Sequence, residues 1–325
     1  MFKLLLSGLA IAAFLITSAP DARAQDKSDF EVILVGTGTP PPLMHRFGPA
    51  TLVRVAGKNF LVDAGRGATQ MLWRKKIPFG KLDSLILTHL HSDHVVGIPD
   101  LWLTGWLRGP YGRRDVPFPV MGPKGTANLM NYLQKAYAWD VDTRVVDQKM
   151  SREAAGVSVK EIGPGVVYDA DGLKITAFET DHGKLIKPTL GYRFDYDGRS
   201  VVVSGDTKYS ENLINHSKGV DVLVHSIGAA KKELLEAAPI WKLILDHHIE
   251  PEDAGKVFTA TAPRLAVYTH VVSLTNGKIK PVGAKEILDR TRTTYKGPLV
   301  MGKDLMSIIV TKDTVKAVPF VAKKK

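Results

Sequence analysis

One short stretch of the chain carries four potential metal ligands. It reads Thr88-His89-Leu90-His91-Ser92-Asp93-His94 and directly follows the apolar segment 82–87. In an extended segment the side chains of His89 and His91 point the same way, and a turn through Ser92 brings Asp93 and His94 to a second, nearby position. Imidazole and carboxylate ligands without sulfur suit zinc, manganese or iron. The spacing therefore predicts a metal site.

The composition limits the chemistry further. The chain has no cysteine, which excludes disulfides, iron–sulfur clusters, thiolate zinc sites and cysteine nucleophiles. It carries 44 Lys and Arg against 33 Asp and Glu, a formal net charge of +11. This excess of positive charge suits an anionic substrate, a nucleic acid or an anionic membrane surface, and does not choose among them.

The first residues are typical of an export signal. Met1-Phe2-Lys3 precedes a mostly apolar run, 4–16, and Ala22-Arg23-Ala24 forms an A-x-A cleavage site. We expect 1–24 to be a cleaved signal peptide and the protein to be periplasmic or secreted. The alternative, a membrane-anchoring first helix, is less favoured because the run is shorter than the ~20 residues that a span needs. No membrane span is expected after cleavage, and 25–325 is predicted to form a single domain.

Apolar, β-branched segments alternate with helical patterns along the rest of the chain. The predicted strands are Val32–Val35, Ala50–Val55, Phe60–Val62, Leu82–Leu87, Gly172–Phe178, Leu190–Phe194, Ser200–Val203, Val220–Val224 and Leu265–Tyr268. The predicted helices are Ala68–Lys75, Thr126–Ala138, Ser210–Ser217, Pro251–Ala260 and Val282–Arg290. This pattern predicts an α/β domain with two sheets and outer helices.

Three later residues are candidate ligands because of their place in this pattern. Asp206 follows the predicted strand that ends at Val203, and His270 follows the one that ends at Tyr268. Asp206 could instead cap the following helix, and His182 alone would more often be an ordinary turn histidine. Their joint position at strand ends favours the metal interpretation.

These motifs resemble the metallo-β-lactamase fold superfamily, whose signature is H-x-H-x-D-H. Gly36-Thr37-Gly38-Thr39-Pro40, Phe60 to Gly65, Asp181-His182-Gly183, Ser204-Gly205-Asp206-Thr207 and Tyr268-Thr269-His270 occur in the family's order. The resemblance implies a four-layer αββα sandwich. The branch that the chain resembles most contains ribonuclease Z and related arylsulfatases and phosphodiesterases.

The resemblance also implies a ligand set for two metal ions, expected to be zinc, with manganese or iron as alternatives. One ion would be held by His89, His91 and His182, the other by Asp93, His94 and His270, with Asp206 bridging the two. Asp93 counts as a catalytic as well as a ligating residue. A hydroxide shared by the metals would be the nucleophile.

The resemblance assigns further roles around the metals. His248 is expected to help proton transfer, with His247 as its neighbouring competitor and His225 as a second catalytic candidate. Ser226 stands where the related enzymes carry glutamate, so the carboxylate expected to orient the proton donor is missing. Asp63 is expected to sit behind the metals without ligating them.

Two features bear on the substrate. Only 24 positions separate His182 from Asp206, and two predicted strands fill them, so the tRNA-binding arm of common bacterial ribonuclease Z has no room there. The stretch from Asp100 to Asp147 concentrates aromatic and arginine side chains. These side chains would suit a small anionic aryl or alkyl ester near the metals. Alternatively, they would be core and dimer contacts. They are Trp102, Trp106, Tyr111, Phe118, Tyr137, Trp139, Arg108, Arg113 and Arg114.

Together these arguments predict an exported dinuclear-zinc hydrolase of small anionic esters, of arylsulfatase or phosphodiesterase type. A homodimer without a stable nucleic-acid partner is expected. The alternatives are a β-lactamase or lactonase and a ribonuclease Z-like phosphodiesterase acting on RNA. An iron oxidoreductase, such as a persulfide dioxygenase or a flavodiiron-like protein, is disfavoured because both predicted ligand sets are complete and no flavin domain follows.

Overall fold

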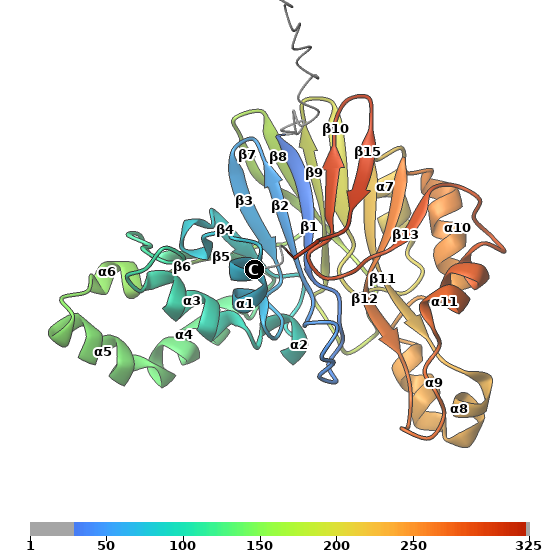
Figure 1. The fold of residues 1–325 in the computed structure, drawn as a ribbon, viewed down its shortest axis with the longest axis horizontal. Coiled ribbons are helices and arrows are strands. Elements are labelled where there is room, and N and C mark those ends of the chain that lie inside the picture. Colours follow the sequence, from blue (N-terminus) through green and yellow to red (C-terminus); the bar gives the residue numbers. More distant parts are fainter. Residues whose placement is uncertain (1–28, 323–325) are drawn as a thin grey trace, which may run out of the picture.

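Two β-sheets face each other and helices cover both outer faces, so the predicted four-layer αββα sandwich is confirmed (Figure 1). The computed structural model describes residues 29–322, and the predicted signal peptide lies outside them. Within 29–322 no helix combines the length and hydrophobicity needed to cross a bilayer.

Sheet 1 has eight strands in the order β15-β14-β1-β2-β3-β4-β5-β6, and sheet 2 has seven in the order β13-β12-β11-β10-β9-β8-β7. The strands of sheet 1 are β1 (Phe30–Gly36), β2 (Ala50–Val55), β3 (Lys58–Val62), β4 (Ser84–Ile86), β5 (Phe118–Gly122), β6 (Val157–Glu161), β14 (Ser307–Val310) and β15 (Val315–Val318). Those of sheet 2 are β7 (Gly165–Ala170), β8 (Leu173–Glu179), β9 (Leu190–Tyr196), β10 (Arg199–Val203), β11 (Val222–Ala229), β12 (Leu265–Ser273) and β13 (Leu299–Met301).

The helices belong to two groups. Those near sheet 1 are α1 (Ala68–Arg74), α2 (Ser92–Val95), α3 (Ile98–Trp106), α4 (Thr126–Ala136), α5 (Ala138–Asp147) and α6 (Arg152–Ala155). Those near sheet 2 are α7 (Glu211–Ser217), α8 (Lys232–Ala237), α9 (Pro239–Leu245), α10 (Pro251–Thr261) and α11 (Ala284–Thr291). In Figure 1, α4 and α5 project on one side, and α8 and α9 extend from the lower end beside β12.

The central strands are apolar without interruption because both of their faces are buried. In β1, Val32 and Leu34 pack between the two sheets, whereas Ile33 and Val35 pack beneath the outer helices. The same alternation recurs in sheet 2, where successive valines of β10 belong to the inner and the outer core in turn. Burial on both faces fixes the pairing register of these strands. A slip of one residue would move the side chains of the inner core to the outer core and the reverse.

All nine predicted strands and all five predicted helical segments are present, with shifted ends. The segment Thr126–Ala138 is divided into α4 and α5 at Tyr137. The prediction missed the helices α2, α3, α6, α8 and α9 and the strands β5, β6, β7, β13, β14 and β15. Most of these elements are short, which leaves little periodic signal. Exposure is not the common cause, because α3, β5 and β14 are largely buried.

Several side chains in the stretch from Asp100 to Asp147 belong to the core, which confirms one of the two interpretations of this middle segment. The expectation that they contact the substrate is wrong for these residues. Trp102 and Trp106 are buried, and their indole N–H groups donate to the carbonyl oxygens of Ala155 and Ser151. Arg114 is buried and donates to three backbone carbonyls of the same region. These side chains hold the α3–α6 region together.

Candidate metal centre

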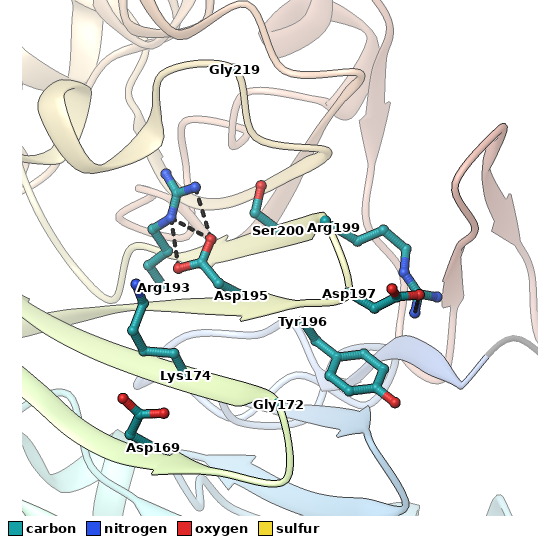
Figure 2. Close-up of a pocket in the computed structure, with 11 residues that line it drawn as sticks. Asp169, Gly172, Lys174, Arg193, Asp195, Tyr196, Asp197, Arg199, Ser200 and Gly219 are labelled. Carbon is teal, nitrogen blue, oxygen red and sulfur yellow. Dashed lines mark hydrogen bonds and ion pairs between the residues drawn. The ribbon is translucent and has the colours of Figure 1, made fainter.

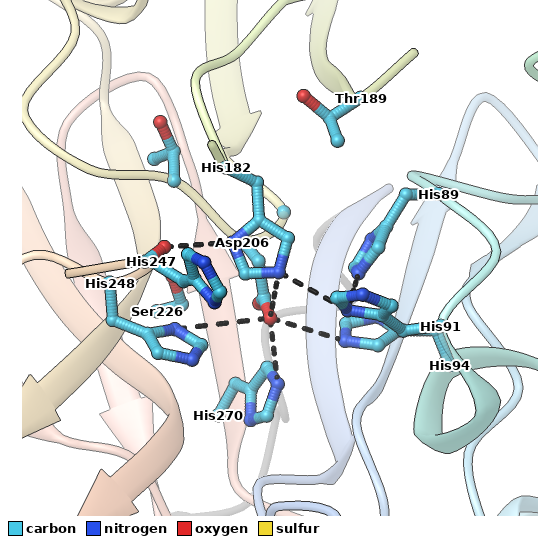
Figure 3. A network of polar contacts seen from close by, with 12 residues as sticks. His89, His91, His94, His182, Thr189, Asp206, Ser226, His247, His248 and His270 are labelled. Carbon is cyan, nitrogen blue, oxygen red and sulfur yellow. Dashed lines mark hydrogen bonds and ion pairs between the residues drawn. The ribbon is translucent and has the colours of Figure 1, made fainter. Parts of the chain in front are cut away.

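The predicted ligands converge at the end of the sandwich where β4, β8 and β10 terminate. His89, His94, His182, Asp206 and His270 are buried and meet in one cluster (Figure 3). The segments that follow the carboxyl ends of β4, β8 and β10 supply all of them except His270. These strand ends of the two sheets lie at the same end of the sandwich, as is usual for sites on open sheets. The cluster is assembled from segments that span residues 89 to 270.

The ligand atoms form two groups that match the predicted sets. Potential ligand atoms of His89, His91 and His182 lie within 4.8 Å of one another, and so do those of Asp93, His94 and His270. Nδ1 of His91 lies 3.0 Å from Nε2 of His89 and 3.2 Å from Nε2 of His182. Nitrogen atoms bound tetrahedrally to zinc at ~2.05 Å are about 3.3 Å apart, so this spacing fits a metal ion.

Asp206 lies between the two groups. Its Oδ2 atom is 3.0 Å from Nε2 of His270, 3.4 Å from Nε2 of His94 and 3.7 Å from Nε2 of His182. This position suits the bridging role that the resemblance implies. Gly205, with φ of 62°, allows the turn that presents Asp206 after β10.

The polar atoms that face this space also fit a cation. Oδ2 of Asp93, Nε2 of His94 and Oδ1 of Asp206 are buried and have no hydrogen-bond partner among the described residues. Buried polar groups are rarely left unpaired, because each costs desolvation free energy. Two divalent cations would satisfy these atoms, so the donor set fits the expected metals.

Hydrogen bonds behind the ligands fix which ring nitrogen faces the metals. Asp63 accepts a bond from Nδ1 of His94 (2.7 Å), and from the backbone N–H and the hydroxyl of Thr88 (2.8 Å each). Because the Thr88 hydroxyl donates to Asp63, it accepts from Nδ1 of His89 at 2.9 Å. In the neutral form of both histidines this leaves Nε2 as an acceptor that can face a metal ion. Asp63 thus lies behind the ligands, as expected from the sequence.

His270 reaches the cluster through an irregularity in its strand. The pairing of β11 with β12 shifts between Ser226 and Ile227, so His270 is an extra residue opposite this step, with φ of 41°. The expectation that His270 follows the end of a strand is therefore wrong, since β12 continues to Ser273. A β-bulge re-aims a side chain, which explains how a residue inside a strand reaches the metal edge.

The electrostatics divide the histidines into two kinds. Burial, with the neighbouring imidazoles, lowers the pKa of His89, His91 and His182. Burial also acts to lower the pKa of His270, but the Asp206 and Asp93 carboxylates together outweigh it and raise this pKa to about 9. Asp63 and Asp206 likewise raise the pKa of His94 despite its burial. In the metal-free protein His270 is thus protonated at neutral pH, and metal binding must displace that proton.

The two catalytic candidates outside the ligand set occupy different positions. His248 borders the cluster, with Nδ1 4.0 Å from Oδ2 of Asp206, and forms a further potential ligand group with Asp206 and His182, just as Asp206 forms one with His89 and His94. His225 is fully buried, against the Ser204 hydroxyl (3.3 Å) and the ring of Phe258. Burial lowers the pKa of His248 to about 3 and that of His225 to about 4. Their catalytic roles remain predictions.

A hollow of about 220 Å³ opens beside the first ligand group. It is lined by His89, Leu90, His91, Lys124 and the loop 185–188. A larger hollow of about 620 Å³ lies at the opposite end of sheet 2, where Arg193 is already paired with Asp195 (Figure 2). Of these two hollows, the smaller one adjoins the ligands.

The comparisons with known proteins agree with this geometry. A family model described as a beta-lactamase superfamily domain matches residues 58–271, and the chain belongs to this superfamily, with the metallo-β-lactamase fold. It is a metal-dependent hydrolase that binds divalent metal ions.

Several of its relatives are ribonucleases Z. The ribonuclease Z of Mycobacterium bovis (strain BCG / Pasteur 1173P2) is 33% identical over 282 residues, which cover 86% of this chain and 98% of that protein. The ribonuclease Z of Mycobacterium avium (strain 104) is 39% identical over 245 residues, covering 75% and 85%.

Solved structures share the fold at low identity. The metallo-β-lactamase fold protein YhfI from Bacillus subtilis superposes with a TM-score of 0.65 at 18% identity, over 86% of this chain and 98% of that one. The short form of human tRNase Z superposes with a TM-score of 0.63 at 19% identity, over 86% of this chain and 100% of that one. The resemblance to the metallo-β-lactamase superfamily and its ribonuclease Z branch is confirmed.

Proposed function

We propose that this chain is a phosphodiesterase that cleaves RNA, as its ribonuclease Z relatives are named for doing. A ribonuclease Z-like enzyme acting on RNA is one of the alternatives that the sequence offers. The named relatives favour it over an exported arylsulfatase. The observation that carries the proposal is the pair of ligand groups joined by Asp206. Such a pair suits phosphoryl transfer, because two cations can stabilise both the attacking and the leaving oxygen.

The chain's own residues would bind and orient the substrate. Lys124 and Lys187 line the hollow beside His89 and His91, where they can attract a phosphate. The Asp63 hydrogen bonds keep the ligand imidazoles in one orientation. Two divalent ions, proposed to be zinc, would supply activated water and neutralise the negative charge that builds on the phosphoryl oxygens.

A second candidate is a small phosphodiester. Between β8 and β9 the chain has only the loop 180–189, and β10 follows directly, so no additional arm lies between His182 and Asp206. A large folded RNA would then have to be held by other parts of the surface. A small anionic ester needs no such arm.

The test is a substrate panel with the zinc-loaded full chain. We expect hydrolysis of fluorophore-labelled RNA, a tRNA transcript included, and of bis-nitrophenyl phosphate. Chelation of the metal and the variant Asp206→Ala should each abolish both activities. Cleavage of bis-nitrophenyl phosphate but not RNA would favour the second candidate. Turnover of only nitrophenyl sulfate, a lactam or a lactone would overturn both.

We also propose export and dimerisation. Export rests on the signal pattern in 1–24, and N-terminal sequencing of the protein recovered from the periplasm or medium tests it. The homodimer rests on exposed aromatic side chains of the middle segment, among them Trp139, which is 78% exposed on α5. Light scattering over a range of concentrations would reveal it, and a concentration-independent monomer would refute it.

A further inference from the structure

Large apolar side chains are exposed on segments at the end of the molecule that carries the metal centre (Figure 1). Met44 and Leu185 have 93% and 97% of their surface exposed. Single exposed apolar residues are common on proteins, but a cluster marks a contact surface. We call this cluster the aliphatic rim; it consists of Met44, Leu90, Val96, Leu185, Ile240 and Leu243.

The rim residues belong to segments that carry or adjoin the ligands. Leu90 stands between His89 and His91, and Leu185 lines the same hollow as these two histidines. Val96 directly follows the ligand-bearing helix α2. Leu90 and Leu185 therefore sit at the entrance itself, and Val96 is on the segment that carries Asp93 and His94.

The other three rim residues lie on neighbouring projections. Met44 is in the β1–β2 loop, which borders a separate hollow with Met71 and Arg74. The start of this loop reaches the ligands, since the carbonyl of Thr37 accepts a hydrogen bond from the backbone of Val271, next to the ligand His270. Ile240 and Leu243 are on α9, which leads directly to His247 and His248. In Figure 1 the β1–β2 loop, α2 and α9 all lie at the lower end of the molecule.

Positive charge accompanies the rim. Lys124, Lys184 and Lys187 are exposed and form no ion pair within residues 29–322. Two of the nearby acidic residues are paired with cations, Asp181 with Lys208 (3.9 Å) and Asp246 with Lys242 (3.6 Å). Glu161, near Lys124, accepts hydrogen bonds from the backbone N–H groups of Gly125 and Ala127. The entrance therefore presents aliphatic side chains together with unpaired cations.

We propose that the aliphatic rim docks on an anionic lipid bilayer, so that the metal centre opens toward the membrane surface. The rim side chains can enter the boundary between headgroups and acyl chains, while the three lysines meet lipid phosphates. The phosphates of a single-stranded nucleic acid could also contact these lysines. Its bases, however, would stack on aromatic rings, and the six rim residues are aliphatic. The inference goes beyond the proposed function and does not depend on it, since docking requires no turnover.

The absence of cysteine from the chain allows a direct test. A single cysteine, introduced as Met44→Cys or Leu185→Cys in the full chain, can be labelled with the environment-sensitive dye nitrobenzoxadiazole. The matched control is Val116→Cys, because Val116 is 54% exposed but precedes the amino end of β5, away from the ligand edge. All three labelled proteins contain residues 1–28. A difference between the labels therefore reports the position of the cysteine and not membrane binding by that segment.

We expect the labels at 44 and 185 to shift to the blue and brighten with phosphatidylglycerol vesicles, and not with phosphatidylcholine vesicles. The label at 116 should not respond. Replacing Lys184 and Lys187 with glutamine should weaken binding about fivefold for each lysine. Unresponsive labels at 44 and 185, or an equal response at 116, would overturn the proposal. A response to single-stranded RNA but not to vesicles would also overturn it. Because hydrolysis of bis-nitrophenyl phosphate is measured separately, failure of docking and failure of the proposed function are distinguishable.

Discussion

Replacing Asp63 with asparagine should weaken metal binding although Asp63 touches no metal. The Asp63 carboxylate accepts three hydrogen bonds, one of them from Nδ1 of the ligand His94 at 2.7 Å. Asparagine has nearly the same shape and tolerates the left-handed backbone at this position, where φ is 61°. The change therefore tests the hydrogen bonds with little backbone strain.

The magnitude follows from what an amide can accept. Its oxygen can keep the bond from the backbone N–H of Thr88, but its nitrogen then faces Nδ1–H of His94 as a second donor. To avoid this clash His94 must move its proton to Nε2, the atom that should bind the metal. Losing a hydrogen bond to a charged group costs about 1.5–3 kcal/mol, or about 10- to 150-fold in affinity.

The assay is competition for zinc with a chromophoric chelator, which resolves the two binding steps. One of them should weaken by the stated factor in Asp63→Asn. The matched control is Asp221→Asn, a buried carboxylate that accepts from Ser200 and Arg264 (2.7 Å each) far from the ligands. It should lower stability without changing zinc affinity. Wild-type affinity in Asp63→Asn at both steps would refute the role given to Asp63.

Three further predictions concern the site and its support. Asp206→Ala should abolish hydrolysis and reduce bound zinc below two ions per chain, as measured by metal analysis; full activity would contradict the shared carboxylate. Zinc binding should release protons at neutral pH, because the pKa of His270 is raised to about 9 in the metal-free protein. The apparent zinc affinity should therefore rise with pH up to about 9. Calorimetry in buffers of different ionisation enthalpy would measure the number of protons released. Tyr192→Phe should destabilise the protein by about 1–2 kcal/mol, since the buried Tyr192 hydroxyl donates to the carbonyl of Leu87 at 2.6 Å; urea denaturation would measure the loss, and an unchanged midpoint would contradict it.

The sequence alone determined much of the metal chemistry. Four ligands fall within six residues, and the absence of cysteine leaves only histidine and carboxylate for the rest. The strands of the core were also predictable, because burial on both faces produces uninterrupted apolar segments that need no long-range information. The elements that were missed are mostly short; α8 is exposed along most of its length, whereas β5 and β14 are buried but span only four or five residues.

Other features were decided only by the tertiary structure. The roles of Trp102, Trp106 and Arg114 could not be predicted, because aromatic and guanidinium groups suit a ligand pocket as well as a core, and only the packing chooses. His270 reaches the metals through a bulge set by the pairing of β11 with β12. The aliphatic rim exists because loops distant in sequence end at one edge of the sandwich. Ligands close together in sequence are constrained by local geometry, whereas these contacts depend on how separate strands are placed in the sheets, which no local pattern encodes.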